Sequence, residues 1–232
     1  MVKAWAGLPD QSFLEREDTA QLVTAVMSKL GSAPELELAQ LPVLVKVING
    51  YESDPKEWPS SRRAYAADAY NLTAQHSKAE PIYREILKDD PDNLHGLRGL
   101  GIALAYQRRF SEGIVPLRKA WDQGDKLSLP TLATCYLGAQ AFDRMSDLIP
   151  SLLKRKKEDT DSLNAIIMYS LAKHPTDRKL FFQAIEGFSD EQLLRNEEVT
   201  HNVVLGLKRF GEQKRAEKLE RLKAEQDNGK RA

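Results

Sequence analysis

Residues 60–127 contain two consecutive copies of one 34-residue pattern. Ala67 in the first copy corresponds to Gly101 in the second, and Tyr83 corresponds to Leu117. Small residues recur where two helices must approach closely, and large residues recur beside them. A period of this length predicts a stack of antiparallel helix pairs, because a single pair leaves an apolar flank that only the next pair can cover.

A third copy follows with a shorter connection. Phe142 lies 32 residues after Phe110, which places Ala133 and Tyr136 at the positions of Gly101 and Leu104. The turn before this copy has therefore lost two residues relative to the others. Beyond the basic run at 154–157 the pattern decays, although apolar residues continue at helical spacing.

The combination of small and bulky positions resembles the tetratricopeptide repeat family over roughly residues 60–153. That motif has small residues at positions 8 and 20, bulky ones at 11 and 24, Ala at 27 and Pro at 32. Counted from Ser60 and then from Leu94, the matching residues are Ala67, Tyr70, Ala79, Tyr83 and Pro91, followed by Gly101, Leu104, Gly113, Leu117 and Ala120. Ile86 departs from the motif at position 27. The resemblance implies an all-α fold, a right-handed superhelical solenoid of antiparallel helix pairs.

The same pattern divides the chain into four predicted parts. They are an N-terminal arm and helical cap (1–58), three repeats (59–153), degenerate helix pairs with a C-terminal capping helix (154–226), and a disordered tail (227–232). An end pair that differs from the repeat is expected, because the exposed end of such an array must be made soluble.

Local signals predict individual helix boundaries. Ser77 with Glu80, and Ser189 with Gln192, have the spacing of a capping box, in which each residue bonds the other's backbone N–H. The helix that Ser189 opens is predicted to reach the region of Phe210. Pro116 and Pro150 fall within second helices of the repeats and are predicted to bend or shorten them.

Composition and charge argue against several classes of function. The 34 basic and 34 acidic residues give a net charge of zero, so no overall field favours nucleic acid. The basic run at 154–157 is interpreted as the C-terminal end of a helix, where cations complement the dipole. No stretch has the length of a membrane span, and we expect a cytoplasmic protein unless the full protein carries a leader or an anchor.

No catalytic, metal or cofactor site is predicted. None of the four histidines has a His or Cys three or four residues away, and Cys135 is expected to be a buried, inert thiol. The glycines at 96, 99 and 101 lack the preceding strand that a dinucleotide-binding motif requires. An enzyme would need a constellation of residues that this sequence does not offer.

The resemblance does predict a binding surface. In such repeats the first helix of each pair lines the concave face through positions 2, 5, 9, 12 and 13. The candidate partner-binding residues are Asp68, Asn71, Leu72, His95, Arg98, Ile102, Tyr106, Thr134 and Leu137. This mixture of polar and apolar side chains suits an extended peptide or a partner helix. The family's carboxylate-gripping variants need Lys and Asn where this chain has Ala64 and Asp68, so chaperone C-terminal tails are not the expected ligand.

These observations predict a non-catalytic protein–protein interaction scaffold that binds a peptide or helix of a partner protein. The alternative is a structural subunit that self-associates within a larger complex, through its N-terminal helices or its last helix. In neither case is a cofactor, a nucleic acid or insertion into a membrane expected.

Overall fold

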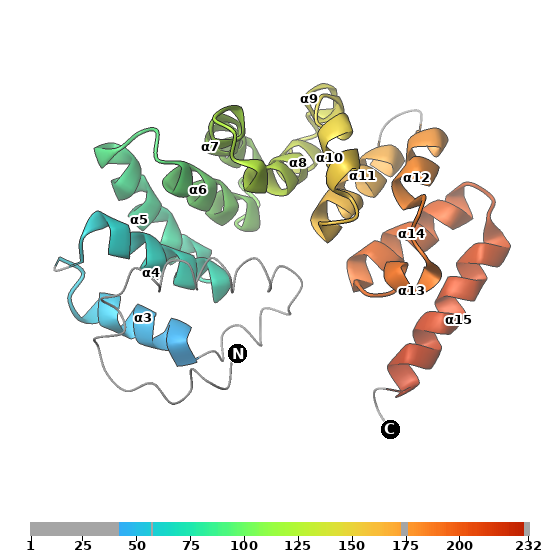
Figure 1. The fold of residues 1–232 in the computed structure, drawn as a ribbon, viewed down its shortest axis with the longest axis horizontal. Helices are drawn as coiled ribbons and strands as arrows, with labels where there is room; N and C mark the ends of the chain where they lie inside the picture. Colours follow the sequence, from blue (N-terminus) through green and yellow to red (C-terminus); the bar gives the residue numbers. More distant parts are fainter. Residues whose placement is uncertain (1–41, 57, 173–175, 230–232) are drawn as a thin grey trace. The chain divides into compact units, whose positions relative to one another are not determined.

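The computed structural model describes residues 42–56, 58–172 and 176–229, and this part of the chain contains helices and no strand (Figure 1). The prediction of an all-α fold is therefore confirmed for these residues. Expectations for residues 1–41 and 230–232 lie outside the described ranges. The chain forms two compact units, Met1–Ser128 and Leu129–Ala232.

The first unit is a succession of helices, each packed on the next along the chain. The helices are α3 (Pro42–Ser53), α4 (Ser60–Leu72), α5 (His76–Asp89), α6 (Leu94–Tyr106) and α7 (Phe110–Asp122), followed by the short 3-10 helix η3 (Lys126–Ser128). Short turns join α4 to α5 and α6 to α7. These two pairs correspond to the first two copies of the sequence pattern, with α4 and α6 as first helices and α5 and α7 as second helices.

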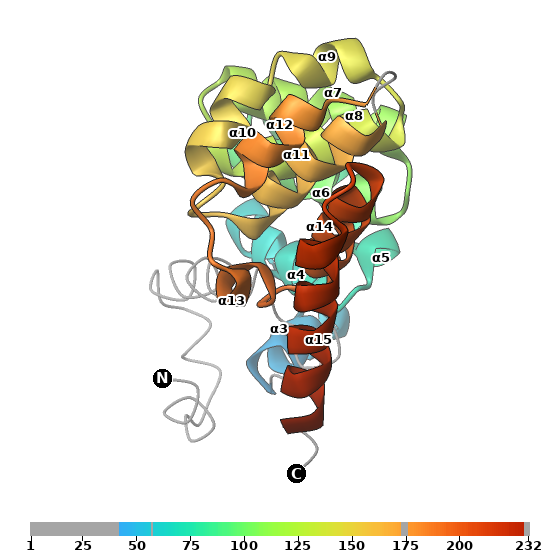
Figure 2. The same ribbon diagram turned by 90° about the vertical axis from the view of Figure 1, so that its right-hand side faces the viewer.

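The second unit continues the pairing less regularly. Its helices are α8 (Leu129–Gly138), α9 (Phe142–Ser146), α10 (Ile149–Arg155), α11 (Thr160–Ala172), α12 (Arg178–Ile185), α13 (Asp190–Leu193), α14 (Glu197–Arg209) and α15 (Gln213–Gly229). Within this unit, α11 packs on α8, α10, α12 and α14. The last helix α15 runs beside α14 (Figures 1 and 2) and buries Ala216 and Leu219 completely, while most of its other side chains are polar.

The turn inside each of the first three pairs repeats one backbone conformation. Ala74, Arg108 and Gln140 have left-handed φ angles of 57°, 60° and 56°, although none of them is glycine. The next N–H closes the turn on a carbonyl five residues back, as in Ala141 N to Tyr136 O at 2.8 Å. The three positions are spaced by 34 and 32 residues, so the predicted register and its two-residue deletion are confirmed at these turns.

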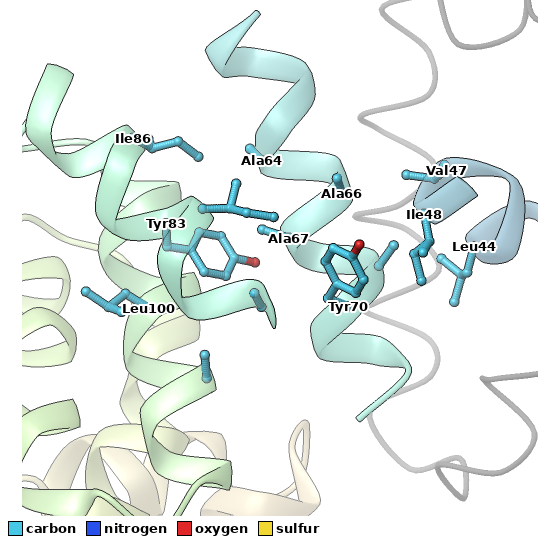
Figure 3. Close-up of a cluster of buried hydrophobic side chains, with 14 of the residues drawn as sticks. Leu44, Val47, Ile48, Ala64, Ala66, Ala67, Tyr70, Tyr83, Ile86 and Leu100 are labelled. Carbon is cyan, nitrogen blue, oxygen red and sulfur yellow. The ribbon is translucent and has the colours of Figure 1, made fainter. Parts of the chain in front are cut away.

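Small residues on first helices make room for large side chains from second helices. A Cβ atom at Gly101 would overlap the side chain of Leu117 in the same pair, as the repeat register predicts. A Cβ atom at Gly99 would overlap the ring of Tyr83, which belongs to the preceding pair. Tyr83 is fully buried and lies beside Ala67 of α4 (Figure 3), so its ring links the two pairs of the first unit.

The second unit uses the same device. Gly206 of α14 faces Phe181 of α12, and a Cβ atom there would overlap the phenyl ring. Phe181 is fully buried. The turn between α14 and α15 has Gly211 at φ 83°, and Glu212 N donates to Leu207 O at 2.8 Å. The α14–α15 hairpin is therefore a helix pair of the same construction as those in the repeats.

The two prolines have different outcomes. The second helix of the third pair is interrupted between α9 and α10, and Pro150 lies in the first turn of α10, where its missing N–H costs little. Shortening at this proline is confirmed. In contrast, α7 is one continuous helix of 13 residues that contains Pro116, so shortening does not occur there, and a bend at Pro116 stays a prediction.

The two capping boxes also differ. Ser189 and Gln192 form the predicted reciprocal bonds, but the helix they open ends at Leu193, because Asn196 caps a new helix through Val199 N. The prediction of one helix reaching Phe210 is therefore wrong. Helix α5 begins at His76 with no side-chain cap, so the box predicted at Ser77 does not form. Ser77 lies inside the helix, and Glu80 accepts hydrogen bonds from other side chains.

Candidate functional site

The candidate residues of the first unit lie where α4 and α6 run side by side, and we call this contact the α4–α6 seam. Asp68 is at its centre, with a residue exposure of 3%. Tyr83 Oη donates to Asp68 Oδ1 at 2.5 Å, and His95 Nε2 lies 2.8 Å from Oδ2 of the same carboxylate. Asp68 is thus held by one side chain from α5 and one from α6.

Asn71 extends this polar network by one helical turn. Its Nδ2 donates to the Gly99 carbonyl at 3.2 Å, and its Oδ1 lies 3.1 Å from His76 Nδ1. The His76 ring in turn stacks on Tyr106, with centroids 4.7 Å apart and planes 10° from parallel. Asp68, Asn71, His95 and Tyr106 therefore belong to one connected cluster, even though they come from two different repeats.

Burial determines the electrostatics of this cluster. Desolvation raises the pKa of the Tyr83 hydroxyl well above its ordinary value, and the Asp68 carboxylate raises it further. Tyr83 is therefore a neutral donor at physiological pH. A buried phenol needs an acceptor, and Asp68 supplies it.

The remaining candidates of this unit are more accessible. Arg98 Nη1 donates to Asp125 Oδ1 at 2.9 Å, which ties α6 to the turn after α7. Leu72 and Ile102 are half-buried. Tyr106 is 61% exposed and presents a ring face to solvent. The surface available to a partner is consequently apolar and aromatic, while the acidic member of the set is internal.

Thr134 and Leu137 lie on α8, in the second unit. Thr134 is exposed, and its hydroxyl donates to the Pro130 carbonyl at 3.1 Å. Leu137 is half-buried. Both residues lie on the first helix of the third pair, and their part in a binding surface stays a prediction.

Two members of the network, His76 and Tyr83, were not among the predicted site residues. The repeat positions that predict the binding surface all belong to first helices, and the repeat position of Tyr83 predicts packing between repeats. Its phenolic hydroxyl was the available signal, because a buried tyrosine at a packing position requires a polar neighbour. Asp68, nine residues into the first helix, was the obvious acceptor in register.

Other features considered for chemistry have structural contacts in this fold. Cys135 is fully buried, and burial raises the pKa of its thiol to about 12. Lys156 donates to the carbonyls of Gln183 and Glu186 at the end of α12, so this member of the basic run has intramolecular partners. Among the described residues, no three His, Cys, Asp or Glu side chains are grouped to hold a metal ion. None of the described helices has the length and apolar character needed to cross a membrane.

Part of the chain is similar in sequence to part of a yeast protein. A stretch of 121 residues is 27% identical to part of the RNA polymerase-associated protein CTR9 of Saccharomyces cerevisiae. The matched stretch is 52% of this chain and 10% of the yeast protein, so the chain corresponds to about a tenth of that relative's length. No protein-family model matches the chain, and no solved structure matches it.

Proposed function

We propose that the chain is a non-catalytic interaction module of the tetratricopeptide type, which binds a peptide or helix of a partner protein on the face of its first helices. The observation that carries the proposal is the accessible surface of α6, where Tyr106 and Ile102 present apolar area above a rigid polar network. A rigid aromatic anchor contributes contact area at low conformational cost.

Two further observations support this proposal. Turns with the same left-handed residue recur at intervals of 34 and 32 residues, which is the construction expected of stacked helix pairs. The yeast relative is named for its association with RNA polymerase, and we take from that name only the expectation that this chain's partner is also a protein.

The proposal is tested by site-specific photocross-linking in a lysate of the source organism. A benzophenone amino acid replaces Tyr106 in one sample and Val115 in another. Val115 is 70% exposed on the second helix α7, so it matches Tyr106 in accessibility but not in position. We expect a discrete cross-linked protein from position 106 alone, and its loss when Ile102→Ser is added.

Identical cross-linking from positions 106 and 115 would contradict binding on the first-helix face. A cross-linked product containing two copies of this chain would instead support the structural subunit that self-associates.

A further inference from the structure

The helices α11 and α14 form a second seam, the α11–α14 seam, within the second unit. Asn202 Nδ2 donates to Asn164 Oδ1 at 2.8 Å, and Arg209 Nη1 donates to the Leu171 carbonyl at 3.2 Å. On each helix the two contact positions are seven residues apart and therefore lie on one face. Side chains between them on the same face line the seam.

Two large apolar side chains occupy that interval. Met168 is four residues after Asn164, and Leu205 is three residues after Asn202, so both lie on the stripe that borders the seam. Met168 is 38% exposed and Leu205 is 48% exposed. The seam side chains before and after them, Asn164, Asn202 and Arg209, are polar, so the exposed apolar patch is small and has polar ends.

The two ends of the patch carry opposite charge. Asp161 lies one turn before Asn164, and Glu198 lies one turn before Asn202, so both carboxylates are at the amino-terminal end of the seam. Neither forms an ion pair with another residue in the described part of the chain. The exposed Arg209 lies at the opposite end.

The carboxylates at the acidic end interact with one another. Asp161 is exposed as a whole residue, yet its carboxylate is partly desolvated by its surroundings. This desolvation, with the charges of Asp159 and Glu198, raises the pKa of Asp161 to about 6. Arg155 already pairs with Asp159, and a further cation that approaches Asp161 and Glu198 would relieve the remaining repulsion between these two carboxylates.

We propose that the α11–α14 seam binds a peptide segment in which a Lys or Arg side chain contacts Asp161 and Glu198 and an apolar side chain covers Met168 and Leu205. The bound segment would place any acidic residue toward Arg209. This surface shares no residue with the α4–α6 seam, so the inference extends the proposed function to a second site and can succeed or fail independently of it.

The dimensions of the seam predict the spacing in the ligand. Asp161 and Met168 are seven residues apart on one helix, which is about 10 Å at the helical rise per residue. An extended peptide covers that distance in about three residues, so its basic and apolar side chains would be about three positions apart. A helical ligand would need about seven positions, and the selected sequences distinguish the two conformations.

The test begins with selection of random 12-residue displayed peptides on the full chain. Selected sequences are synthesised with a fluorophore, and Kd is measured by fluorescence anisotropy. We expect enriched peptides to carry Lys or Arg at one of the two spacings from an apolar residue. We expect Met168→Ser/Leu205→Ser and Asp161→Asn/Glu198→Gln each to weaken binding about tenfold or more.

Matched controls separate this site from the rest of the molecule. Val115→Ser removes an exposed apolar side chain from α7, and Tyr106→Ala removes the ring from the α4–α6 seam; neither should change Kd for these peptides. In a charge-swap experiment, Asp161→Lys/Glu198→Lys should lose the original peptide and bind one whose basic residue is replaced by Glu.

The inference is overturned if selection yields no common pattern or yields peptides without a basic residue. It is also overturned if the selected peptides bind both double variants with unchanged Kd. Circular dichroism of each variant accompanies the binding data, and substitution of the peptide's own basic residue by Glu tests the charge contact on the unmodified protein. Loss of peptide binding in the Tyr106→Ala variant would assign the peptides to the other seam and would likewise overturn the inference.

Discussion

The α4–α6 and α11–α14 seams are built on the same contact but leave different surfaces. In each, an aromatic ring from a second helix presses on a glycine of the next first helix, Tyr83 on Gly99 and Phe181 on Gly206. Tyr83 carries a hydroxyl, whose burial requires a hydrogen-bond acceptor, and the buried Asp68 carboxylate is that acceptor. Phe181 has no polar side-chain atom, so its burial requires no hydrogen-bond partner.

The hydroxyl oxygen of Tyr83 accounts for much of the difference between the surfaces of the two seams. In the α4–α6 seam a carboxylate, a phenol and an imidazole are committed to each other, and the accessible remainder is aromatic and aliphatic. In the α11–α14 seam an amide pair and the hydrogen bond from Arg209 to the Leu171 carbonyl join the helices, while carboxylates and apolar side chains stay at the surface. The chemistry of a repeat surface thus depends on whether the packing ring behind it is polar.

The largest effect should come from filling the glycine contacts. Alanine is normally the better helical residue by up to about 1 kcal/mol. Gly99→Ala and Gly206→Ala are nevertheless expected to lower the free energy of unfolding by roughly 1–3 kcal/mol, because each Cβ atom overlaps a buried ring. Urea unfolding measures the loss.

Tryptophan fluorescence and circular dichroism, measured together, show which unit a substitution destabilises. Trp58 and Trp121 both belong to the first unit, so tryptophan fluorescence reports on Gly99→Ala more directly than circular dichroism does. The control is Gly96→Ala, where the nearest atom is the tip of the flexible Leu87 side chain at 3.1 Å. If all three substitutions have equal effects, ring-on-glycine packing is not what positions these helices.

A smaller difference is expected between the polar groups of the two seams. Asp68→Ala leaves the Tyr83 hydroxyl and His95 without their acceptor and should cost about 1–3 kcal/mol of unfolding free energy. Asn202→Ala removes one amide hydrogen bond and should cost about 1 kcal/mol. Chemical denaturation of the two variants gives the comparison.

Tyr83→Phe makes the first seam resemble the second and tests the explanation directly. In that background Asp68→Ala should cost less than in the parent protein, by a coupling of about 1 kcal/mol in a double-mutant cycle. Additive effects would mean that the Tyr83 hydroxyl does not determine the burial of Asp68.

The sequence predicted the helix pairs well because close packing imposes residue size at fixed intervals. Gly101 and Leu117 meet as their repeat positions require, and the two-residue deletion before the third copy is reproduced at Gln140. Helix ends were harder to predict, since Ser77 and Ser189 have similar capping patterns and only Ser189 forms the box. The choice depends on tertiary partners, which at Glu80 are Gln107 and Arg109 of the next repeat.

The candidate site was predictable only in part for the same reason. Repeat positions identified Asp68 and Tyr106 as residues of the first helices, but they could not distinguish the buried carboxylate from the exposed ring. That distinction depends on Tyr83 and His76 from a second helix. The α11–α14 seam was not predicted at all, because the repeat pattern has decayed there and supplies no register.

A further comparison concerns the turns, where smaller effects are expected. Ala74 adopts a left-handed φ of 57° without being glycine, and the equivalent turn after α14 uses Gly211 at 83°. Ala74→Gly should raise the free energy of unfolding by about 0.5–1 kcal/mol, and Gly211→Ala should lower it by about 1 kcal/mol. No atom lies within 4 Å of a Cβ at Gly211, so backbone conformation alone would be responsible.

Thermal melts measure both changes at the turns. Gly124 has a φ of 93° and equally open surroundings, and Gly124→Ala should behave like Gly211→Ala. A stabilising Gly211→Ala would show that the α14–α15 turn is not constructed like those of the repeats.

The smallest expected effect is the pH dependence that Asp161 gives to the free energy of unfolding. It should amount to a few tenths of a kcal/mol, because solvent screens an exposed carboxylate. Asp161 has a pKa raised from 3.8 to about 6, so between these values the folded chain binds a proton that the unfolded chain releases. Stability therefore falls as pH rises from about 4 to about 6. Asp161→Asn should remove this component, so the stability of the variant relative to the parent should increase across that window.

Urea midpoints by circular dichroism at successive pH values measure the difference, and Asp147→Asn serves as an exposed carboxylate control on the same unit. The stability of the α4–α6 seam should change at alkaline pH. Because the pKa of Tyr83 is raised, its contribution to stability is retained below its ordinary value of 10.0 and is lost as the pH increases beyond it. If Asp161→Asn has the same effect at pH 4 and pH 7, the pKa of Asp161 is not raised in the folded chain.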